Sequence, residues 1–163
     1  MVHGPATGVL GHATYLETRL TMAPDDPPGL SISLRGADAS LKQLRTAVSD
    51  YCNREQIESR AQRHIKVIVD ELLSNMLLHA TAVQGQDLMI GLQLNRSEGR
   101  LRMVFTDNGQ AFNPLEADAP DLGVSLEERQ IGGLGLHIIR QLTATQTYER
   151  EGSSNILTLT IDL

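Results

Sequence analysis

The sequence predicts a two-layer α/β (α+β) sandwich, with helices packed on one face of a mixed, mostly antiparallel sheet. Its segments follow one another in the order strand, helix, helix, hairpin, loop, helix, hairpin. Hairpins join most of the strands, and a hairpin makes an antiparallel pair. The strands alternate apolar and polar residues, so one face of the sheet is expected to be buried beneath the helices.

The composition limits the classes of protein that fit. The chain has 163 residues, of which 40% are hydrophobic and 21% are charged, as in a globular domain of ordinary size. The net charge is −6, and the aromatic residues are three Tyr and two Phe, with no Trp. Phosphates require a basic protein face and bases require stacking surfaces, so nucleic acid is not expected as a partner.

The sequence shows neither a membrane helix nor a signal peptide, and it has one cysteine; these features indicate where the protein is located and whether it forms disulfide bonds. No apolar run is long enough for a membrane helix, and the N-terminus does not have the pattern of a signal peptide. We therefore expect a cytoplasmic protein with no membrane partner. Cys52 is the single cysteine, which excludes an internal disulfide bond, and we interpret it as a small buried residue.

The chain is expected to divide into a flexible leader, residues 1–29, and an ordered domain, residues 30–163. The leader is rich in Gly, Pro, Ala and Thr and ends in the proline-rich run Pro24–Gly29, which cannot hold a helix. The domain opens with a strand in which Leu30, Ile32 and Leu34 alternate with serines.

Two helices are predicted next. The first spans about residues 39–54, with Asp38 as its N-cap. The second is long and reaches about Thr81, because apolar residues recur at helical spacing over several turns. Ser59 and Gln62 have the spacing of a capping box at its start.

The second half of the chain is predicted as two hairpins separated by a loop and a helix. The first hairpin spans residues 88–105 and turns at Ser97–Gly99. The loop Asp107–Ile131 is long enough to suggest a functional role, and Ser125–Glu128 is expected to form one helical turn within it. A helix over residues 131–142 follows, then strands over Gln146–Arg150 and Ile156–Leu163.

The long helix carries a polar stripe beside its apolar face. Glu71, Asn75 and His79 lie at positions i, i+4 and i+8 and therefore share one side of the helix. One interpretation is a solvated helix edge with local hydrogen bonds. The other is a site in which Glu71 is a general base and Asn75 is an oxygen ligand of Mg²⁺.

A second motif, Asp107-Asn108-Gly109, follows the returning strand of the hairpin. Such a sequence commonly makes a turn. A carboxylate at the end of a buried strand can instead accept a hydrogen bond from an exocyclic amine, while Gly109 lets a flat ring approach the backbone. Adenine fits that description.

A third motif, Gly132-Gly133-Leu134-Gly135, opens the last helix. Glycines allow the backbone to approach an anion, and the N–H groups and dipole of a helix start favour phosphate, although such sequences also form plain tight turns. The motif is not a Walker A loop, because no Lys-Ser/Thr follows. It is not a Rossmann fingerprint either, because a long loop precedes it.

In this order the three motifs resemble those of the GHKL (Bergerat-fold) ATP-binding family, which includes gyrase, a heat-shock chaperone, histidine kinases and MutL. Val69–Ala80 resembles the N box, Asp107–Pro114 the first glycine box and Gly132–Leu136 the second. The resemblance covers about residues 30–163 and implies a two-layer sandwich of helices on a mixed sheet. The Glu-x-x-x-Asn form of the N box resembles the branch of anti-sigma factor serine/threonine kinases.

The resemblance implies roles for individual residues. Glu71 would be catalytic and polarise the attacking hydroxyl, and Asn75 would hold Mg²⁺. Asp107 would read the adenine amine. The implied ligands of ATP are Asn75, Asp107, Gly109, Gly132, Gly133, Leu134 and Gly135. The charge of the phosphates would be met by Arg129, Arg140 or Mg²⁺, and the segment from about Asn113 to Ile131 would be a lid.

The function implied by the resemblance is an ATP-dependent protein kinase that acts in transcription regulation by partner switching. It would phosphorylate a small anti-anti-sigma (STAS-type) antagonist and bind a sigma factor or a similar regulator, and a homodimer is a reasonable expectation. Two alternatives stay open. One is a non-catalytic nucleotide-sensing module that binds a protein, and the other is a detached histidine kinase ATPase domain.

Overall fold

The computed structural model describes residues 29–35, 41–79, 87–116 and 134–163. Its elements are β1 (Leu30–Arg35), α1 (Leu41–Arg54), α2 (Ser59–His79), β2 (Met89–Ser97), β3 (Arg100–Asp107), the short 3₁₀ helix η1 (Pro114–Glu116), α3 (Leu134–Leu142), β4 (Thr145–Glu151) and β5 (Ser154–Asp162). Every predicted strand is present, and the predicted helices lie within two or three residues of their expected bounds.

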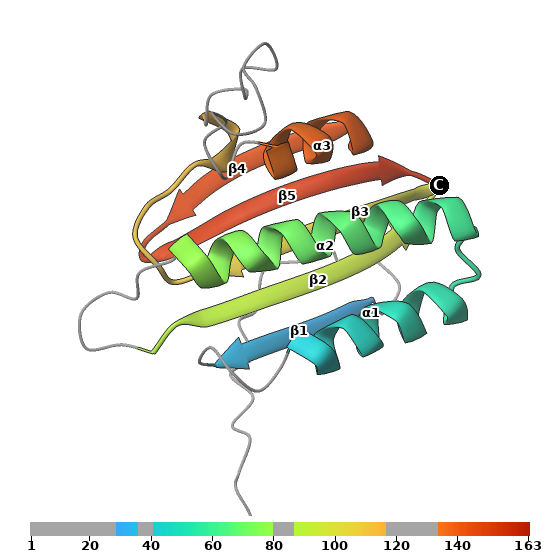
Figure 1. Cartoon of the computed structure of the whole chain (residues 1–163), viewed down its shortest axis with the longest axis horizontal. Coiled ribbons are helices and arrows are strands. Elements are labelled where there is room, and N and C mark those ends of the chain that lie inside the picture. The colour runs from blue at the N-terminus through green and yellow to red at the C-terminus, as the bar shows by residue number, and fades with distance from the viewer. Residues whose placement is uncertain (1–28, 36–40, 80–86, 117–133) are drawn as a thin grey trace, which may run out of the picture.

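The strands form one five-stranded sheet in the order β1-β2-β3-β5-β4. Figure 1 shows α1, α2 and α3 lying side by side over one face of it, with α2 crossing the middle strands. The predicted two-layer arrangement and mostly antiparallel sheet are confirmed. All four pairings of the described strands are antiparallel, so the parallel pair that a mixed sheet would contain is not found among them. The reason is that β5 returns between β3 and β4 and runs opposite to both.

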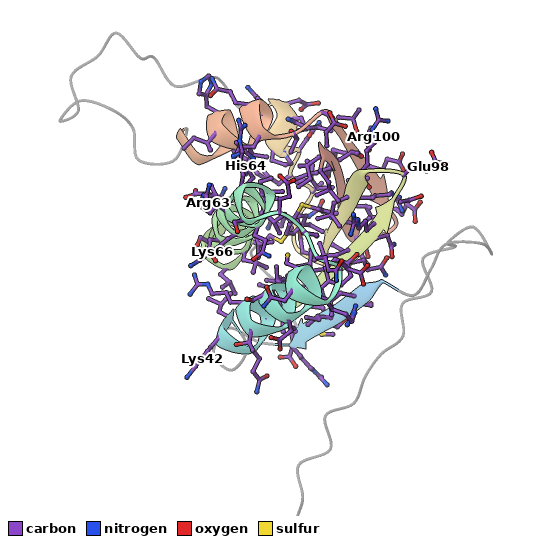
Figure 2. The ribbon with its side chains drawn as sticks, turned by 90° about the vertical axis from the view of Figure 1, so that its right-hand side faces the viewer. Lys42, Arg63, His64, Lys66, Glu98 and Arg100 are labelled. Carbon is purple, nitrogen blue, oxygen red and sulfur yellow. The ribbon has the colours of Figure 1, made fainter. Side chains whose placement is uncertain are left out.

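The core lies between the helices and the sheet. Alternating side chains of the three middle strands point toward the helices and are almost completely buried. The side chains of one stripe of α2 are buried against them. Removing this apolar surface from water stabilises the fold. The members of this set include Leu92, Leu94, Leu101, Met103, Phe105 and Leu159 of the sheet and Ile65, Ile68, Leu72 and Leu73 of α2. The opposite side of α2 is polar, and Arg63 and Lys66 project from it away from the sheet (Figure 2).

The β2–β3 hairpin turns through Glu98 and Gly99. Figure 2 shows Glu98 and Arg100 close together on the side of the molecule opposite Arg63 and Lys66. Both residues of the turn have positive φ, 48° at Glu98 and 76° at Gly99. A two-residue turn of this kind matches the right-handed twist of the strands that it joins. The register that results pairs Ile90 with Asp107 and places the end of β3 beside the start of β2.

The predicted capping box at Ser59 is wrong. Ser59 is already the first residue of α2, and the backbone N–H of Gln62 donates to the carbonyl of Glu58 at 2.9 Å. The side chain of Gln62 donates to the carbonyl of Ile57 at 2.8 Å and so ties the helix to the preceding turn. Gln62 therefore bonds to Glu58 and Ile57 and not to Ser59, as the predicted capping box would require.

Several predictions lie outside the described residues. They are the flexible leader up to residue 28, the N-cap at Asp38, the helical turn at Ser125–Glu128, the glycines Gly132 and Gly133, and residue Arg129. The division into a leader and a domain therefore stays a prediction. No helix in the described ranges has the length and apolar character needed to cross a membrane.

Cys52 is confirmed as a small buried residue. Its side chain is 2% exposed and lies in the core on α1. Burial raises the pKa of its thiol, because the charged thiolate is poorly solvated there. A thiol in this state is a weak nucleophile, which fits a packing role.

Candidate functional site

A pocket of about 170 Å³ opens between α2, the end of β3, the segment that follows it and the β4–β5 hairpin. Its walls are mainly apolar, and one carboxylate, three side-chain amides and a tyrosine stand among them. It is lined by Leu72, Asn75, Met76, Phe105, Asp107, Gln110, Ala111, Phe112, Pro114, Tyr148, Asn155 and Leu157. A cavity of about 150 Å³ accepts a benzene ring. The pocket therefore has the size and the apolar character that suit a flat ring.

Asp107 is the carboxylate of this pocket and is 8% exposed. Its Oδ1 atom accepts two hydrogen bonds, from the backbone N–H of Gly109 at 2.8 Å and from Nδ2 of Asn155 at 2.7 Å. Both bonds use the same oxygen, and no donor of the described residues reaches Oδ2. Oδ2 is thus the oxygen available to a donor on a ligand in the pocket.

Asn155 holds the loop that carries Asp107. It faces Asp107 directly across the β3–β5 ladder and is 6% exposed. Its Nδ2 atom donates to the carbonyl of Gln110 at 2.9 Å as well as to Asp107. Its Oδ1 atom accepts hydrogen bonds from Tyr148 Oη at 2.8 Å, Arg150 Nη1 at 2.7 Å and the backbone N–H of Phe112 at 3.4 Å.

The other residues of the Asp-Asn-Gly motif have separate roles. Gly109 is buried, and its carbonyl accepts a hydrogen bond from Arg150 at 2.9 Å. Asn108 instead bonds to the segment at the start of β2. Its Oδ1 accepts a hydrogen bond from the N–H of Met89 at 2.7 Å, and its Nδ2 donates to the carbonyl of Asp87 at 3.0 Å. One motif therefore serves both the pocket and the sheet.

The predicted residues of α2 divide between the pocket and its border. Asn75 lines the pocket. Glu71 lies one helical turn earlier, and its carboxylate rests against Gly135 in the first turn of α3. A Cβ atom added to Gly135 would overlap Oε2 of Glu71 and lie 2.9 Å from its Cδ. Within the described residues no hydrogen bond or ion pair engages Glu71. His79 is the last residue of α2.

Of the expected phosphate ligands, the structure describes Gly135 and the backbone of Leu134, the first residue of α3. Arg140 is occupied by the protein itself, since its Nη2 donates to the carbonyl of Leu115 in η1 at 2.8 Å. Arg140 therefore secures the segment that leaves the pocket. Of the described residues, no three His, Cys, Asp or Glu side chains cluster closely enough to hold a metal ion by themselves.

The motifs did not include Asn155, Tyr148 and Arg150, which the structure adds to the site, and they gave no role to Phe112, which lies within the first glycine box. The positions of the aromatic residues were a usable signal. The chain has only five Phe and Tyr residues, and three of them, Phe105, Phe112 and Tyr148, line the pocket. Asn155 gave a weaker signal: a polar residue directly before the alternating apolar residues of a strand is usually assigned to a turn.

The pocket combines mainly apolar walls with a carboxylate oxygen that no donor of the described residues engages, which suits a flat ring that carries an amino group. The chain belongs to the family of histidine kinase-like ATPase domains, which it matches over residues 34–161. That match includes α1, α2, α3, the strands β2, β3 and β4, most of β5 and every residue that lines the pocket, but only the last two residues of β1.

Named relatives of the chain are protein kinases. The serine/threonine-protein kinase BtrW of Bordetella bronchiseptica is 33% identical over 107 residues, which cover 66% of this chain and 75% of BtrW. The serine-protein kinase RsbW of Listeria monocytogenes is 29% identical over 119 residues, which cover 70% of this chain and 75% of RsbW.

Among solved structures, a similar chain is the histidine kinase domain of a blue-light activated histidine kinase from Erythrobacter litoralis. The TM-score is 0.49 and the sequence identity is 18%. The match covers 74% of this chain and 61% of that chain.

Proposed function

We propose that the protein is an ATP-dependent serine/threonine protein kinase that phosphorylates a small antagonist protein and binds a sigma factor or a similar regulator. The observation that supports this most strongly is the juxtaposition of the pocket, with Asp107 and Asn75 on its walls, and the carboxylate of Glu71 one helical turn away, which no hydrogen bond or ion pair of the described residues engages. The kinase activity named for the relatives BtrW and RsbW agrees with it.

Adenine is the base that fits the pocket. The apolar side chains of Leu72, Met76 and Phe105 offer surface to a flat ring. Oδ2 of Asp107, which has no donor among the described residues, accepts a hydrogen bond from the 6-amino group. A buried carboxylate that gains such a donor is stabilised by about 1.5–3 kcal/mol.

The phosphates extend from the pocket toward the start of α3. There the N–H groups of a helix start and its dipole favour anions, and α3 begins at Leu134 and Gly135. With Gly132 and Gly133, which precede them in the sequence, they would let the backbone approach the phosphates. Asn75 Oδ1 would hold Mg²⁺, which takes one or two oxygen ligands from the protein and the rest from phosphates and water. The lack of an acidic metal cluster in the described ranges fits an ion that arrives with the nucleotide. Mg²⁺ would neutralise charge on the phosphates.

Glu71 then acts as the general base. Its carboxylate accepts the proton of a serine or threonine hydroxyl of the protein substrate as the hydroxyl oxygen bonds to the γ-phosphorus. The bond between that phosphorus and the bridging oxygen breaks, and ADP leaves with the electron pair. Catalysis consists mainly of positioning, since the transferred group needs little help beyond alignment and charge neutralisation.

The partner is proposed as an anti-anti-sigma antagonist of the STAS type, with unphosphorylated antagonist and sigma factor competing for the kinase. A homodimer and a cytoplasmic location complete the proposal. The relatives named as serine kinases support a protein substrate, and the acidic net charge of −6 is in keeping with a protein partner and not a nucleic acid.

The test is transfer of label from γ-³²P-ATP with Mg²⁺ to a protein of an extract of the source cell. We expect one small labelled protein whose phosphate survives acid, as phosphoserine and phosphothreonine do and phosphohistidine does not. Glu71→Gln should lower the labelling rate at least about 100-fold while ATP affinity changes little. Asp70→Asn is the matched control, because Asp70 neighbours Glu71 on α2 but pairs with Arg45 outside the pocket.

The outcomes separate the alternatives. ATP binding without labelling of any protein would favour a nucleotide-sensing module that binds its partner without phosphorylating it. Acid-labile labelling would favour a histidine kinase ATPase domain. Equal labelling by the wild type and Glu71→Gln would refute the role of Glu71.

A further inference from the structure

The orientation of the Asn155 amide is fixed by its neighbours. Its two N–H groups are used by two acceptors, the Asp107 carboxylate at 2.7 Å and the Gln110 carbonyl at 2.9 Å. Its oxygen faces the guanidinium of Arg150, at 2.7 Å, which can only donate. Turning the amide over would set donor against donor and acceptor against acceptor, so only one orientation satisfies the site.

The fixed amide has a consequence for Asp107. Oδ1 of Asp107 is used twice, by Asn155 and by the N–H of Gly109, which leaves Oδ2 for the ligand. Rotation of the carboxylate would break both bonds in a site where Asp107 and Asn155 are 8% and 6% exposed. Water has little access to replace them there, so the cost of rotation is high.

Asn155 also sets the shape of the pocket wall. It holds the Gln110 carbonyl and the N–H of Phe112, and Arg150 holds the Gly109 carbonyl. One side chain of β5 and one of β4 thus fix the segment that follows Asp107. The amide is suited to this task because it donates twice and accepts at the same time, which an ionised carboxylate or an apolar side chain cannot do.

We propose that Asn155 is a positioning residue for base recognition: by holding Oδ1 of Asp107, it leaves Oδ2 as the oxygen of that carboxylate that no described donor engages, and so gives the site its preference for a purine with a 6-amino group. A carboxylate oxygen held in place accepts a hydrogen bond from the 6-amino group of a purine. It makes no such bond to a purine that lacks the group, and it repels the oxygen of a purine with a carbonyl there. This inference rests on the proposed adenine pocket.

The experiment compares the dissociation constants of ATP and of purine riboside triphosphate, which lacks the 6-amino group, by calorimetry. The wild type should prefer ATP by about 10- to 100-fold, the value of one hydrogen bond to a charged acceptor. Asn155→Leu, which keeps the size of the side chain, should weaken ATP binding about tenfold and change binding of the analogue less than about threefold. Arg150→Met, at a partly exposed site, should act in the same direction with a smaller effect.

A double-mutant cycle tests whether Asn155 acts through Asp107. In an Asp107→Asn background, Asn155→Leu should alter ATP affinity less than about threefold, because the oriented carboxylate is already gone. Asn95→Leu is the matched control, since Asn95 is also a buried asparagine of the sheet but does not line the pocket. It should leave the ratio of the two dissociation constants unchanged.

The results distinguish this inference from the proposed function. A wild type that does not bind ATP would overturn both. A wild type that prefers ATP, with Asn155→Leu and Arg150→Met keeping the full preference, would overturn the role of Asn155 alone. If Asn155→Leu does not fold, Arg150→Met decides the question. Equal weakening of both nucleotides would show a purely structural role and also overturn the inference.

Discussion

Gly135 shows how a single missing side chain can serve catalysis. Its Cα lies so close to the Glu71 carboxylate that a Cβ atom would overlap Oε2. The obstructing atoms are the end of a flexible side chain, so a larger residue at position 135 would displace the carboxylate and leave the backbone in place. The glycine therefore leaves room for the proposed base as well as for phosphate.

Gly135→Ala should reduce phosphoryl transfer without weakening the fold. Alanine is favoured over glycine within a helix by up to about 1 kcal/mol, so the free energy of unfolding should not fall. The displaced carboxylate should lower kcat about 10- to 100-fold, because misplacing a catalytic group by about 1 Å has effects of that size. Steady-state kinetics with the labelled protein substrate and urea unfolding measure the two quantities.

The Gly135→Ala, Glu71→Gln double variant shows whether the two residues act together. If Gly135 acts through Glu71, the double variant should have the kcat of Glu71→Gln alone. Multiplied losses of kcat, or a loss confined to ATP affinity, would instead assign Gly135 to phosphate binding only.

At the scale of single elements, the β2–β3 hairpin sets the register that brings Asp107 to the pocket. The turn residues Glu98 and Gly99 both have positive φ. A shift of one residue would move every side chain of β3 to the other face of the sheet. The turn is far from the pocket along the strands, but the pocket depends on the register that the turn fixes.

Gly99→Ala should destabilise the protein by about 1–2 kcal/mol, because a Cβ atom is disfavoured in the left-handed conformation. No neighbouring atom lies within 4 Å of such a Cβ, so the effect is one of backbone conformation alone. Glu98→Gly is the control within the same turn and should not destabilise, since glycine relieves the unfavourable φ of 48°. Urea unfolding monitored by circular dichroism gives both values, and equal losses of stability would contradict this account.

Local patterns predicted most of the elements and part of the site. Asp107 and Asn75 were found because each belongs to a short motif on one element, and both line the pocket. Asn155 was missed because it meets Asp107 only through pairing of β3 with β5, across 48 positions of the chain. Sequence spacing does not encode strand order, which is also why the purely antiparallel pairing of the described strands was not foreseen. The capping box failed for a local reason: the Glu58 carbonyl already accepts the N–H of Gln62 that the Ser59 side chain was expected to cap, and the side chain of Gln62 donates to Ile57.

At the scale of the whole molecule, the pocket joins distant parts of the chain. Its lining comes from α2, β3, the segment after β3, β4 and β5, and so includes residues as far apart as Leu72 and Leu157. A ligand that contacts all these elements at once binds the folded state and not the unfolded chain. Binding must therefore raise the stability of the whole domain.

ATP with Mg²⁺ should raise the free energy of unfolding by about 2.7 kcal/mol at a free concentration 100 times the dissociation constant. For a domain of this size that corresponds to a rise in Tm of several degrees. Asp107→Asn, which removes the proposed acceptor of the base, should weaken ATP binding about 10- to 100-fold and so lower the rise to about 0.4–1.4 kcal/mol at the same ATP concentration. Glu71→Gln should keep the full rise, because Glu71 is proposed to contact the reacting hydroxyl and not the base. Thermal unfolding of the three proteins with and without ATP provides the measurement. A rise of equal size in all three would mean that ATP binds elsewhere, and loss of the rise in Glu71→Gln as well as Asp107→Asn would mean that Glu71 serves binding instead of catalysis.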